Sequence, residues 1–359
     1  MAKLCSITIN GTTFAANAGD RVLDAALLNG IDLPHDCRAG QCGTCLVRLL
    51  DGHVLGGHCA EFGAVHACQA HIVSDLTLAS DQVPSIDEID GEIVSINDLV
   101  RDVVEVTIAT SAPLTQMPGQ YARVTFAGYP ARNYSPTMAL DGSDQPGTFR
   151  LHIRRLAEGR VSSRIGMHTA SGIGVGHPVI IKGPFGSAFF RPGHANRLVL
   201  IASGTGFAPI WAIADSALRE NASRAIVVVA GARCLEDLYM APALQRMSTC
   251  PNVTVCPVVE APQNVLAVVR AGRPADFATL IAPGDIVHAA GAPAMVMAIE
   301  HAARAAGVAF HADPFTPSAP ERASWVASTK GLLRHATAQR PVAAQARSLQ
   351  PQFVAHRRW

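Results

Sequence analysis

Hydrophobic and polar positions alternate at the start of the chain in a pattern typical of strands. Residues 4–9 and 12–15 alternate on either side of Asn10-Gly11, which is a strong signal for a hairpin turn. Residues 20–29 then place apolar side chains at helical spacing, and Gly30 is suited to end that helix. Two more strands are expected, at 46–50 and 71–78, with a turn at Asp51-Gly52 after the first of them. This part of the chain is therefore predicted to be a small α+β domain.

The pattern changes at residue 91 and again at residue 195. Between 91 and 194, short β-rich runs separated by turn residues predict a small antiparallel barrel or sandwich. Between 195 and 315, apolar strand-like runs alternate with helical patterns, which is typical of a doubly wound parallel α/β sheet. The strand-like runs lie at Glu92–Ile96, Val103–Ala109, Ala122–Phe126, Thr148–Arg154, Pro178–Ile181, Leu198–Ala202, Ala225–Val229, Val253–Val259 and Ile286–Ala289, and the helical ones at Ala208–Arg219 and Ala294–Ala306.

These changes predict three domains, a linker and a tail. The first domain is expected over residues 1–83 and the linker, which contains Pro84 and several acids, over 84–90. The second and third domains follow over 91–194 and 195–315. The tail, 316–359, has seven Lys or Arg residues against one acid, a net +6 that leaves −5 for the rest of the chain. Its composition is typical of a disordered segment, and a docking segment for an acidic partner is the alternative.

Composition and charge exclude some classes of protein. The chain of 359 residues is 49% hydrophobic and can bury several cores, and its net charge of +1 gives no reason to expect nucleic acid as a partner. The most apolar stretch, 198–214, is interrupted by Gly204, Gly206 and Pro209, so no membrane span is predicted. We expect no signal peptide, because the chain starts Met-Ala-Lys and continues directly into a strand pattern.

Three cysteines lie close together, at Cys37, Cys42 and Cys45. This C-x4-C-x2-C run is the spacing of a plant-type 2Fe-2S site, which takes one more cysteine further along, whereas zinc sites usually show paired C-x2-C units. Gly40 and Gly43 allow the loop backbone to approach a cluster, because glycine has no Cβ. Thiols that are kept free for metal indicate a reducing compartment, so we expect a cytoplasmic protein.

The fourth ligand is either Cys68 or Cys59. The chain resembles plant-type ferredoxins here, because Cys68-Gln69 matches the segment that contains their last ligand, just before a final strand at 71–78. The stretch 46–67 that precedes Cys68 is shorter than is usual for that family. Loops shorten at little cost in free energy. The resemblance therefore implies a β-grasp domain in which Cys37, Cys42, Cys45 and Cys68 bind the cluster.

A short motif, Arg132-Asn133-Tyr134-Ser135, follows one of the predicted barrel strands. An arginine can fork onto a phosphate, and a tyrosine face can stack on an aromatic ring. The motif resembles the R-x-Y-S of ferredoxin–NADP reductase-like flavoproteins. The resemblance implies that Arg132 binds a flavin phosphate, and that Tyr134 and Ser135 are catalytic, Tyr134 on the flavin ring and Ser135 near its N5. Taken alone, Tyr134 and Ser135 would be ordinary core and edge residues of a barrel.

Members of that family have a second flavin segment downstream, which residues 152–155 and 159–162 resemble. The resemblance implies flavin contacts from His152, Arg154, Val161 and Ser162. Residues 159–163 are expected to open a helix, whose N-terminus can bind phosphate. An ordinary N-cap is the alternative role of Ser162. Residues 182–186 match the family's turn at the end of the barrel.

Glycines follow the first predicted strand of the third domain, in Gly204-Thr205-Gly206. Glycines at a strand-to-helix turn let the backbone approach a pyrophosphate, which the helix dipole also favours. With Pro209 downstream, the segment differs from the Rossmann G-x-G-x-x-G and resembles the G-T-G-x-x-P of the reductase family. The resemblance implies that Gly204, Thr205, Gly206 and Pro209 contribute to a nicotinamide cofactor site.

The end of the third domain continues the resemblance. Gly291 and Pro293 match the family's C-G-x-P-x-M loop, with Ala290 in place of the cysteine that lies near the nicotinamide. This departure is compatible with binding and puts the efficiency of hydride transfer in question. Phe315, together with Asp313, resembles the family's closing acid and aromatic residue, and either covers the flavin ring or caps the domain core. Arg233 is placed to contact a 2′-phosphate, but NADH-using members also have an arginine there, so NADH is expected and NADPH is the alternative.

Taken together, the three domains resemble the single-chain reductase components of bacterial aromatic-ring-hydroxylating dioxygenases and related oxygenases. The resemblance spans residues 1–315. It implies an NADH-dependent oxidoreductase, monomeric and containing FAD, that passes electrons through FAD and a 2Fe-2S cluster to a ferredoxin or a terminal oxygenase. Two alternatives remain: a reductase for a diiron monooxygenase or sugar-deoxygenation partner, and a redox sensor that does not turn over, which Ala290 motivates.

Overall fold

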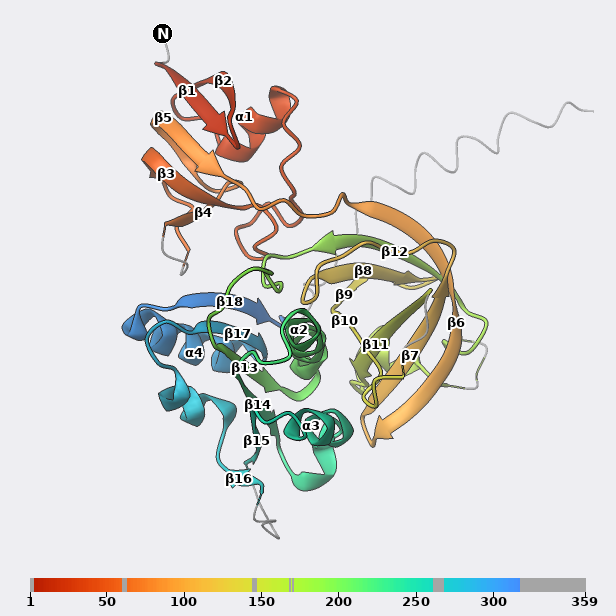
Figure 1. The fold of residues 1–359 in the computed structure, drawn as a ribbon. Coiled ribbons are helices and arrows are strands. Elements are labelled where there is room, and N and C mark those ends of the chain that lie inside the picture. Colours follow the sequence, from red (N-terminus) through yellow and green to blue (C-terminus); the bar gives the residue numbers. More distant parts are fainter. Residues whose placement is uncertain are drawn as a thin grey trace, which may run out of the picture. The chain divides into compact units, whose positions relative to one another are not determined.

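The computed structural model describes residues 3–59, 63–143, 147–167, 169, 171–260 and 268–316. Its strands form three sheets of five, seven and six strands, which follow one another along the chain (Figure 1). The prediction of an α+β domain, an antiparallel domain and a parallel α/β domain is therefore confirmed. Residues 317–359, most of the predicted basic tail, lie outside the described residues. In the described part of the chain, every helix is too short or too polar to cross a membrane.

The first sheet has the strand order β2-β1-β5-β3-β4. Strands β1 and β5 run parallel and the other neighbours antiparallel, and the helix α1 packs its apolar face on the sheet, which is the β-grasp arrangement. The predicted turn at Asp51-Gly52 is wrong, because both residues lie inside β3, where the register against β5 shifts. The elements are β1 (Leu4–Ile9), β2 (Thr12–Asn17), α1 (Val22–Leu28), β3 (Leu46–Leu55), β4 (Ala64–His66) and β5 (His71–Ala79).

The second sheet is antiparallel, curves into a nearly closed barrel and has the order β10-β11-β7-β6-β12-β8-β9. Its first strand begins at Asp87, inside the segment expected to be a linker, because residues 87–90 pair with β12. The helix expected from residue 159 is wrong: only the single 3-10 turn η1 forms there. The elements are β6 (Asp87–Val100), β7 (Val103–Thr110), β8 (Tyr121–Phe126), β9 (Arg132–Tyr134), β10 (Pro136–Thr137), β11 (Thr148–Arg154), η1 (Ser162–Arg164) and β12 (Pro178–Phe185).

The third sheet is parallel throughout and has the order β16-β15-β14-β13-β17-β18. The chain builds outward from β13 in one direction and then returns to add β17 and β18 on the other side. The order therefore reverses between β13 and β17, which is where such sheets bind ligands. The elements are β13 (Leu198–Ser203), η2 (Gly204–Gly206), α2 (Phe207–Glu220), β14 (Ile226–Ala232), η3 (Leu235–Asp237), α3 (Ala241–Ser248), β15 (Val253–Val259), β16 (Arg270–Ala271), η4 (Pro274–Leu280), β17 (Ile286–Gly291), α4 (Pro293–Ala306) and β18 (Ala309–Pro314).

Helix α2 joins the barrel to the third sheet. Its residues are buried almost without interruption, because the helix packs on the sheet with one face and on barrel residues with another. Trp211 donates its indole N–H to the Ala139 carbonyl at 3.1 Å, and the Thr137 hydroxyl donates to the Ala208 carbonyl at 2.9 Å. Since α2 begins directly after Gly206, these contacts fix the glycine turn next to the barrel.

Candidate functional site

The cysteine loop between α1 and β3 turns backbone N–H groups toward a thiol. Gly40 and Gly43 adopt left-handed conformations, with φ of 70° and 71°, which fold the loop tightly. The Sγ of Cys37 accepts the N–H groups of Ala39 and Cys42 at 3.3 and 3.4 Å. Burial pushes the pKa of the Cys37 thiol up, but these backbone N–H bonds outweigh burial and lower the pKa overall. The loop thus favours the thiolate, which is the form that binds metal.

The four cysteines predicted as ligands lie in two pairs. Cys42 contributes to the pKa shift of the Cys37 thiol, and Cys68 to that of Cys45, so the two side chains of each pair lie close together. Cys45 also interacts electrostatically with Cys42, so the two pairs are near each other. Burial, reinforced by the neighbouring thiols, raises the pKa of Cys45 to about 12, so metal binding would release its proton.

This donor set fits a binuclear iron–sulfur cluster. Such a cluster takes four cysteines, two on each iron. Among the described residues, no three His, Cys, Asp or Glu side chains converge as they would around one metal ion. Cys59, the alternative fourth ligand, donates its thiol to the Ala64 carbonyl at 3.4 Å. The pairing of Cys68 with Cys45 therefore favours Cys68.

Residues at the two ends of the cysteine loop bond to the barrel. Asp36, directly before Cys37, accepts a hydrogen bond from the Tyr121 hydroxyl at 2.9 Å and forms an ion pair with Arg123. Its side chain is only 7% exposed, so the ion pair is poorly screened by water. At the other end, the Thr44 hydroxyl accepts the N–H of Gly186 at 3.0 Å. The loop is thereby held against β8 and the end of β12.

The flavin motif lies on β9, which pairs with β8. Arg132 donates to the neighbouring Ala131 carbonyl at 2.8 Å and forms no ion pair within the described chain, so its guanidinium suits a phosphate. The Tyr134 ring meets Phe126 edge to face at 6.5 Å, and burial raises the pKa of its hydroxyl. The buried Ser135 donates its hydroxyl to Asp313. These groups fit an FAD site in which Arg132 would hold a phosphate.

In the second predicted flavin segment, two of the four predicted side chains, His152 and Val161, are buried. His152 is buried, with its Nε2 3.6 Å from Glu105 and its ring 5.2 Å from that of Tyr239. Val161 is buried in the barrel core. Ser162 accepts the Leu156 N–H at 3.2 Å and so closes a loop. Because η1 spans only three residues, the helix N-terminus expected to bind phosphate at Ser162 does not form.

The two glycine motifs of the third sheet meet at the point where the strand order reverses. A Cβ at Gly206 would lie 2.2 Å from the carbonyl oxygen of Ala290, so only glycine fits there. The Ala292 N–H donates to the Ser203 hydroxyl at 2.9 Å. Phe315 donates its N–H to the Gly291 carbonyl at 2.8 Å. Thr205 lies in the turn itself, and Pro209 and Pro293 lie in the first turns of α2 and α4.

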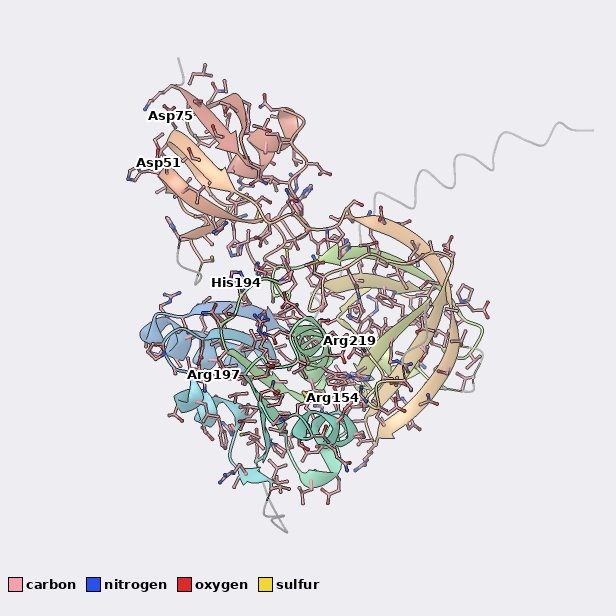
Figure 2. All side chains as sticks on the ribbon, viewed as in Figure 1. Asp51, Asp75, Arg154, His194, Arg197 and Arg219 are labelled. Carbon is pink, nitrogen blue, oxygen red and sulfur yellow. The ribbon has the colours of Figure 1, made fainter. Side chains whose placement is uncertain are left out.

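Two arginines predicted by the sequence meet at one carboxylate. Arg154 lies where the barrel meets the third domain (Figure 2), and its guanidinium is 3.3 Å from the position of a Cβ at Gly204. Its Nε is 3.3 Å from Oδ2 of Asp102, and a guanidinium nitrogen of Arg233 is 3.6 Å from the same oxygen. Asp102 thus connects the two arginines beside the glycine turn.

The sequence analysis missed acids that contact the predicted site residues, among them Asp36, Asp102 and Asp237. Asp36 adjoins the first cysteine, and Asp237 follows Arg233 at a spacing of four residues, so both had a local signal. Asp102 had none, because its partners lie on β11 and after β14. The site therefore combines a thiol-rich loop, a flavin-type barrel motif and a dinucleotide crevice, which together define an iron–sulfur flavoprotein with a nicotinamide domain.

Comparison with known proteins gives the same three domains. Residues 7–73 match the 2Fe-2S iron-sulfur cluster binding domain, residues 90–190 the oxidoreductase FAD-binding domain and residues 200–301 the oxidoreductase NAD-binding domain. The ferredoxin–NAD(P)+ reductase component of the naphthalene 1,2-dioxygenase system of Pseudomonas putida is 30% identical over 335 residues, 86% of this chain and 97% of that protein. Reductase component 1 of the terephthalate 1,2-dioxygenase of Comamonas sp is 31% identical over 330 residues, 85% of this chain and 95% of that protein.

A solved structure shares the whole arrangement. The ferredoxin reductase in carbazole 1,9a-dioxygenase superposes with a TM-score of 0.59 at 25% identity, over 88% of this chain and 99% of that one. The chain belongs to the family of ferredoxin–NAD(P)+ reductase components, with 2Fe-2S, FAD and NAD-binding domains in one polypeptide. It is an oxidoreductase of that electron-transfer family.

Proposed function

We propose that this protein oxidises NADH and delivers the electrons, through FAD and a 2Fe-2S cluster, to the ferredoxin or terminal oxygenase of an aromatic-ring-hydroxylating dioxygenase. One observation supports this most strongly: a loop with two cysteine pairs is bonded at both ends to the flavin-type barrel. The contact joins the part of the chain that would hold the cluster to the part that would hold the flavin. We also propose a monomer in the cytoplasm, because a loop of thiols kept for a metal cluster indicates a reducing compartment.

We assign the cluster ligands to Cys37, Cys42, Cys45 and Cys68. When bound, FAD accepts a hydride and releases electrons one at a time, and the protein's part is to hold and orient the cofactors. Arg132 would hold an FAD phosphate, and Tyr134 would pack beside the flavin ring. Further flavin or nicotinamide contacts are assigned to Arg154, Ser162, Gly204, Thr205, Gly206, Pro209, Arg233, Gly291, Pro293 and Phe315. His152 and Val161 are buried in the barrel, so we assign them to its packing instead.

We assign a positioning role to the hydrogen bond between Ser135 and Asp313. The bond fixes the direction of the Ser135 hydroxyl at the boundary of the barrel and the third domain. Because its one proton is directed at Asp313, the hydroxyl oxygen can accept a hydrogen bond from a bound cofactor without reorienting. Ala290 is buried and has no thiol, where the family has a cysteine. The crevice would therefore position the nicotinamide by its shape and by the Ser135 hydroxyl.

Reconstituted protein should be tested against separate acceptors. The proposal predicts that NADH supports steady product formation by a Rieske-type aromatic dioxygenase, with its ferredoxin where one is needed. Faster turnover with a diiron hydroxylase would favour the monooxygenase alternative. That alternative is suggested by a relative, the electron transfer component of a xylene/toluene monooxygenase of Pseudomonas putida, which is 30% identical over 249 residues. If NADH supports steady reduction of neither oxygenase system nor cytochrome c, the protein is not a reductase, and the redox-sensor alternative is favoured.

A further inference from the structure

Arg233 is an exposed arginine with two carboxylate partners. It follows β14, and its side chain is 67% exposed. One guanidinium nitrogen lies 3.6 Å from Asp102 and another lies 3.6 Å from Asp237. An exposed arginine at the end of a parallel strand would otherwise attract a phosphate group. Here two negative charges already face it.

Asp102 is held firmly in place. It lies in the turn between β6 and β7, and its carbonyl accepts the Arg155 N–H at 2.7 Å. Its Oδ2 is 3.3 Å from Arg154 and 3.6 Å from Arg233. Its Oδ1 is buried and has no hydrogen-bond partner among the described residues. The carboxylate is therefore balanced by two arginines that belong to different domains.

The two arginines face different parts of the crevice. Arg154 lies over Gly204, at the turn where the pyrophosphate of a dinucleotide would lie. Arg233 lies one strand further out, after β14, beside the acids of η3. Two guanidinium groups and two carboxylates leave the cluster neutral. A phosphate with a charge of roughly −2 would make the cluster strongly negative, whereas a ribose hydroxyl adds no charge and can donate to a carboxylate.

We infer that Asp102, with Asp237, makes the protein select NADH over NADPH by occupying the guanidinium of Arg233. This inference rests on the proposed function, because it concerns the cofactor of that reaction. Asp102 belongs to the barrel, and it determines cofactor specificity by pairing with Arg233 at the ribose end of the crevice. The effect is electrostatic, so it should weaken as salt is added.

The full-length holoenzyme and its Asp102→Asn variant should be compared with NADH and NADPH, using ferricyanide as acceptor. Asparagine keeps the size of the side chain and removes its charge. We expect the NADPH-to-NADH ratio of kcat/KM to rise about tenfold, and more at low ionic strength. Asp237→Asn should raise the ratio in the same direction. The matched control is Asp98→Asn, which removes a charge from the same hairpin, where Asp98 pairs with Arg155 at 2.6 Å; it should leave the ratio unchanged.

A binding measurement makes the test independent of turnover. Calorimetric titration with adenosine 2′,5′-bisphosphate and with adenosine 5′-monophosphate compares the two ribose ends directly. The wild type should prefer the monophosphate, and Asp102→Asn should gain about tenfold in affinity for the bisphosphate alone. A wild type that prefers NADPH, or a ratio that Asp102→Asn and Asp98→Asn shift equally, would overturn the inference. Failure of the wild type to oxidise either nicotinamide would instead contradict the proposed function, and the titrations would still decide the role of Asp102.

Discussion

The hydroxyl of Ser135 donates a hydrogen bond of 3.1 Å to the carboxylate of Asp313, across 178 positions of sequence. Ser135 follows β9 of the barrel, and Asp313 lies on β18 at the edge of the third sheet. Burial raises the pKa of Asp313 to about 6, although the bond from Ser135 acts in the opposite direction. The contact between the two domains thus contains a carboxyl group that titrates close to neutral pH.

Asp313 should make the stability of the protein depend on pH. Its pKa rises from 3.8 to about 6 on folding, so between those values the folded state keeps a proton that the unfolded state has lost. Its contribution to the free energy of unfolding therefore falls as pH rises through that window, and above it the charge costs roughly 3 kcal/mol. Asp313→Asn should stabilise the protein more at pH 8 than at pH 4, measured by chemical denaturation. An equal effect at both pH values would show that the carboxyl is not shifted.

The choice of fourth ligand predicts opposite spectra for two cysteine variants. Cys68 is buried and lies close to Cys45, whereas Cys59 donates to a backbone carbonyl. Cys68→Ser should abolish the visible absorption and the electron paramagnetic resonance signal of the reduced cluster. Cys59→Ser should keep both. The reverse pattern would assign the ligand to Cys59, and loss of the signals in both variants would mean that neither substitution is informative about ligation alone.

Asp36 should control electron transfer from the barrel to the cysteine loop. Removing its charge leaves Arg123 without its partner and loosens the contact with Tyr121. We expect Asp36→Asn to slow reduction of the cluster about tenfold, since small displacements at a reacting contact cost large factors in rate. Reduction of the flavin by NADH should be unchanged. Rapid mixing separates the two phases.

The control for that variant is Asp24→Asn. Asp24 pairs with Arg38 at 3.1 Å, but both side chains are about half exposed, 44% and 51%. Exposed pairs of this kind contribute roughly 0–1 kcal/mol. If Asp24→Asn slows the cluster as much as Asp36→Asn does, the bond to the barrel is not the cause.

Gly206 should be irreplaceable in the crevice. An alanine Cβ would approach the Ala290 carbonyl to 2.2 Å. Ala290 is held by its pairing with Ala202 of the parallel strand β13, and Gly206 lies in the short turn between β13 and α2. Gly206→Ala should lower the free energy of unfolding by about 1–3 kcal/mol through overpacking and weaken NADH binding. Gly174→Ala is the matched control, since no atom lies within 4 Å of its Cβ position. Thermal unfolding and an NADH titration measure the two effects, and similar results for both variants would contradict the argument.

Local patterns predicted most of the elements. Alternation predicted the strand Leu4–Ile9 with the bounds that the structure has, because the strand buries one face. The β-rich run Thr148–Arg154 also has the predicted bounds. Asp51-Gly52 was mistaken for a turn, since a glycine inside a bulged strand has the same sequence signature as one in a turn. The helix expected from residue 159 failed because Ser162 bonds backward to Leu156 instead of capping a helix.

The site was predictable where its residues are adjacent in sequence and missed where they are not. The run from Cys37 to Cys45, Arg132–Ser135 and Gly204–Gly206 are each contiguous. Asp102 was missed because its significance depends on two arginines that are distant in sequence. Arg154 comes near it through the pairing of β11 with β7, and Arg233 through the packing of the third domain on the barrel. Resemblance to a family supplies roles for motif residues, but it does not reveal such pairings.

Anaerobic rapid mixing of the reconstituted protein with NADH tests the central claim most directly. Flavin and cluster absorb at different wavelengths, so their reduction can be followed separately in one experiment. The account predicts that the flavin is reduced first and the cluster afterwards, and that Cys68→Ser keeps the first phase and loses the second. Reduction of the cluster without prior reduction of the flavin, or a flavin that NADH does not reduce, would contradict the account.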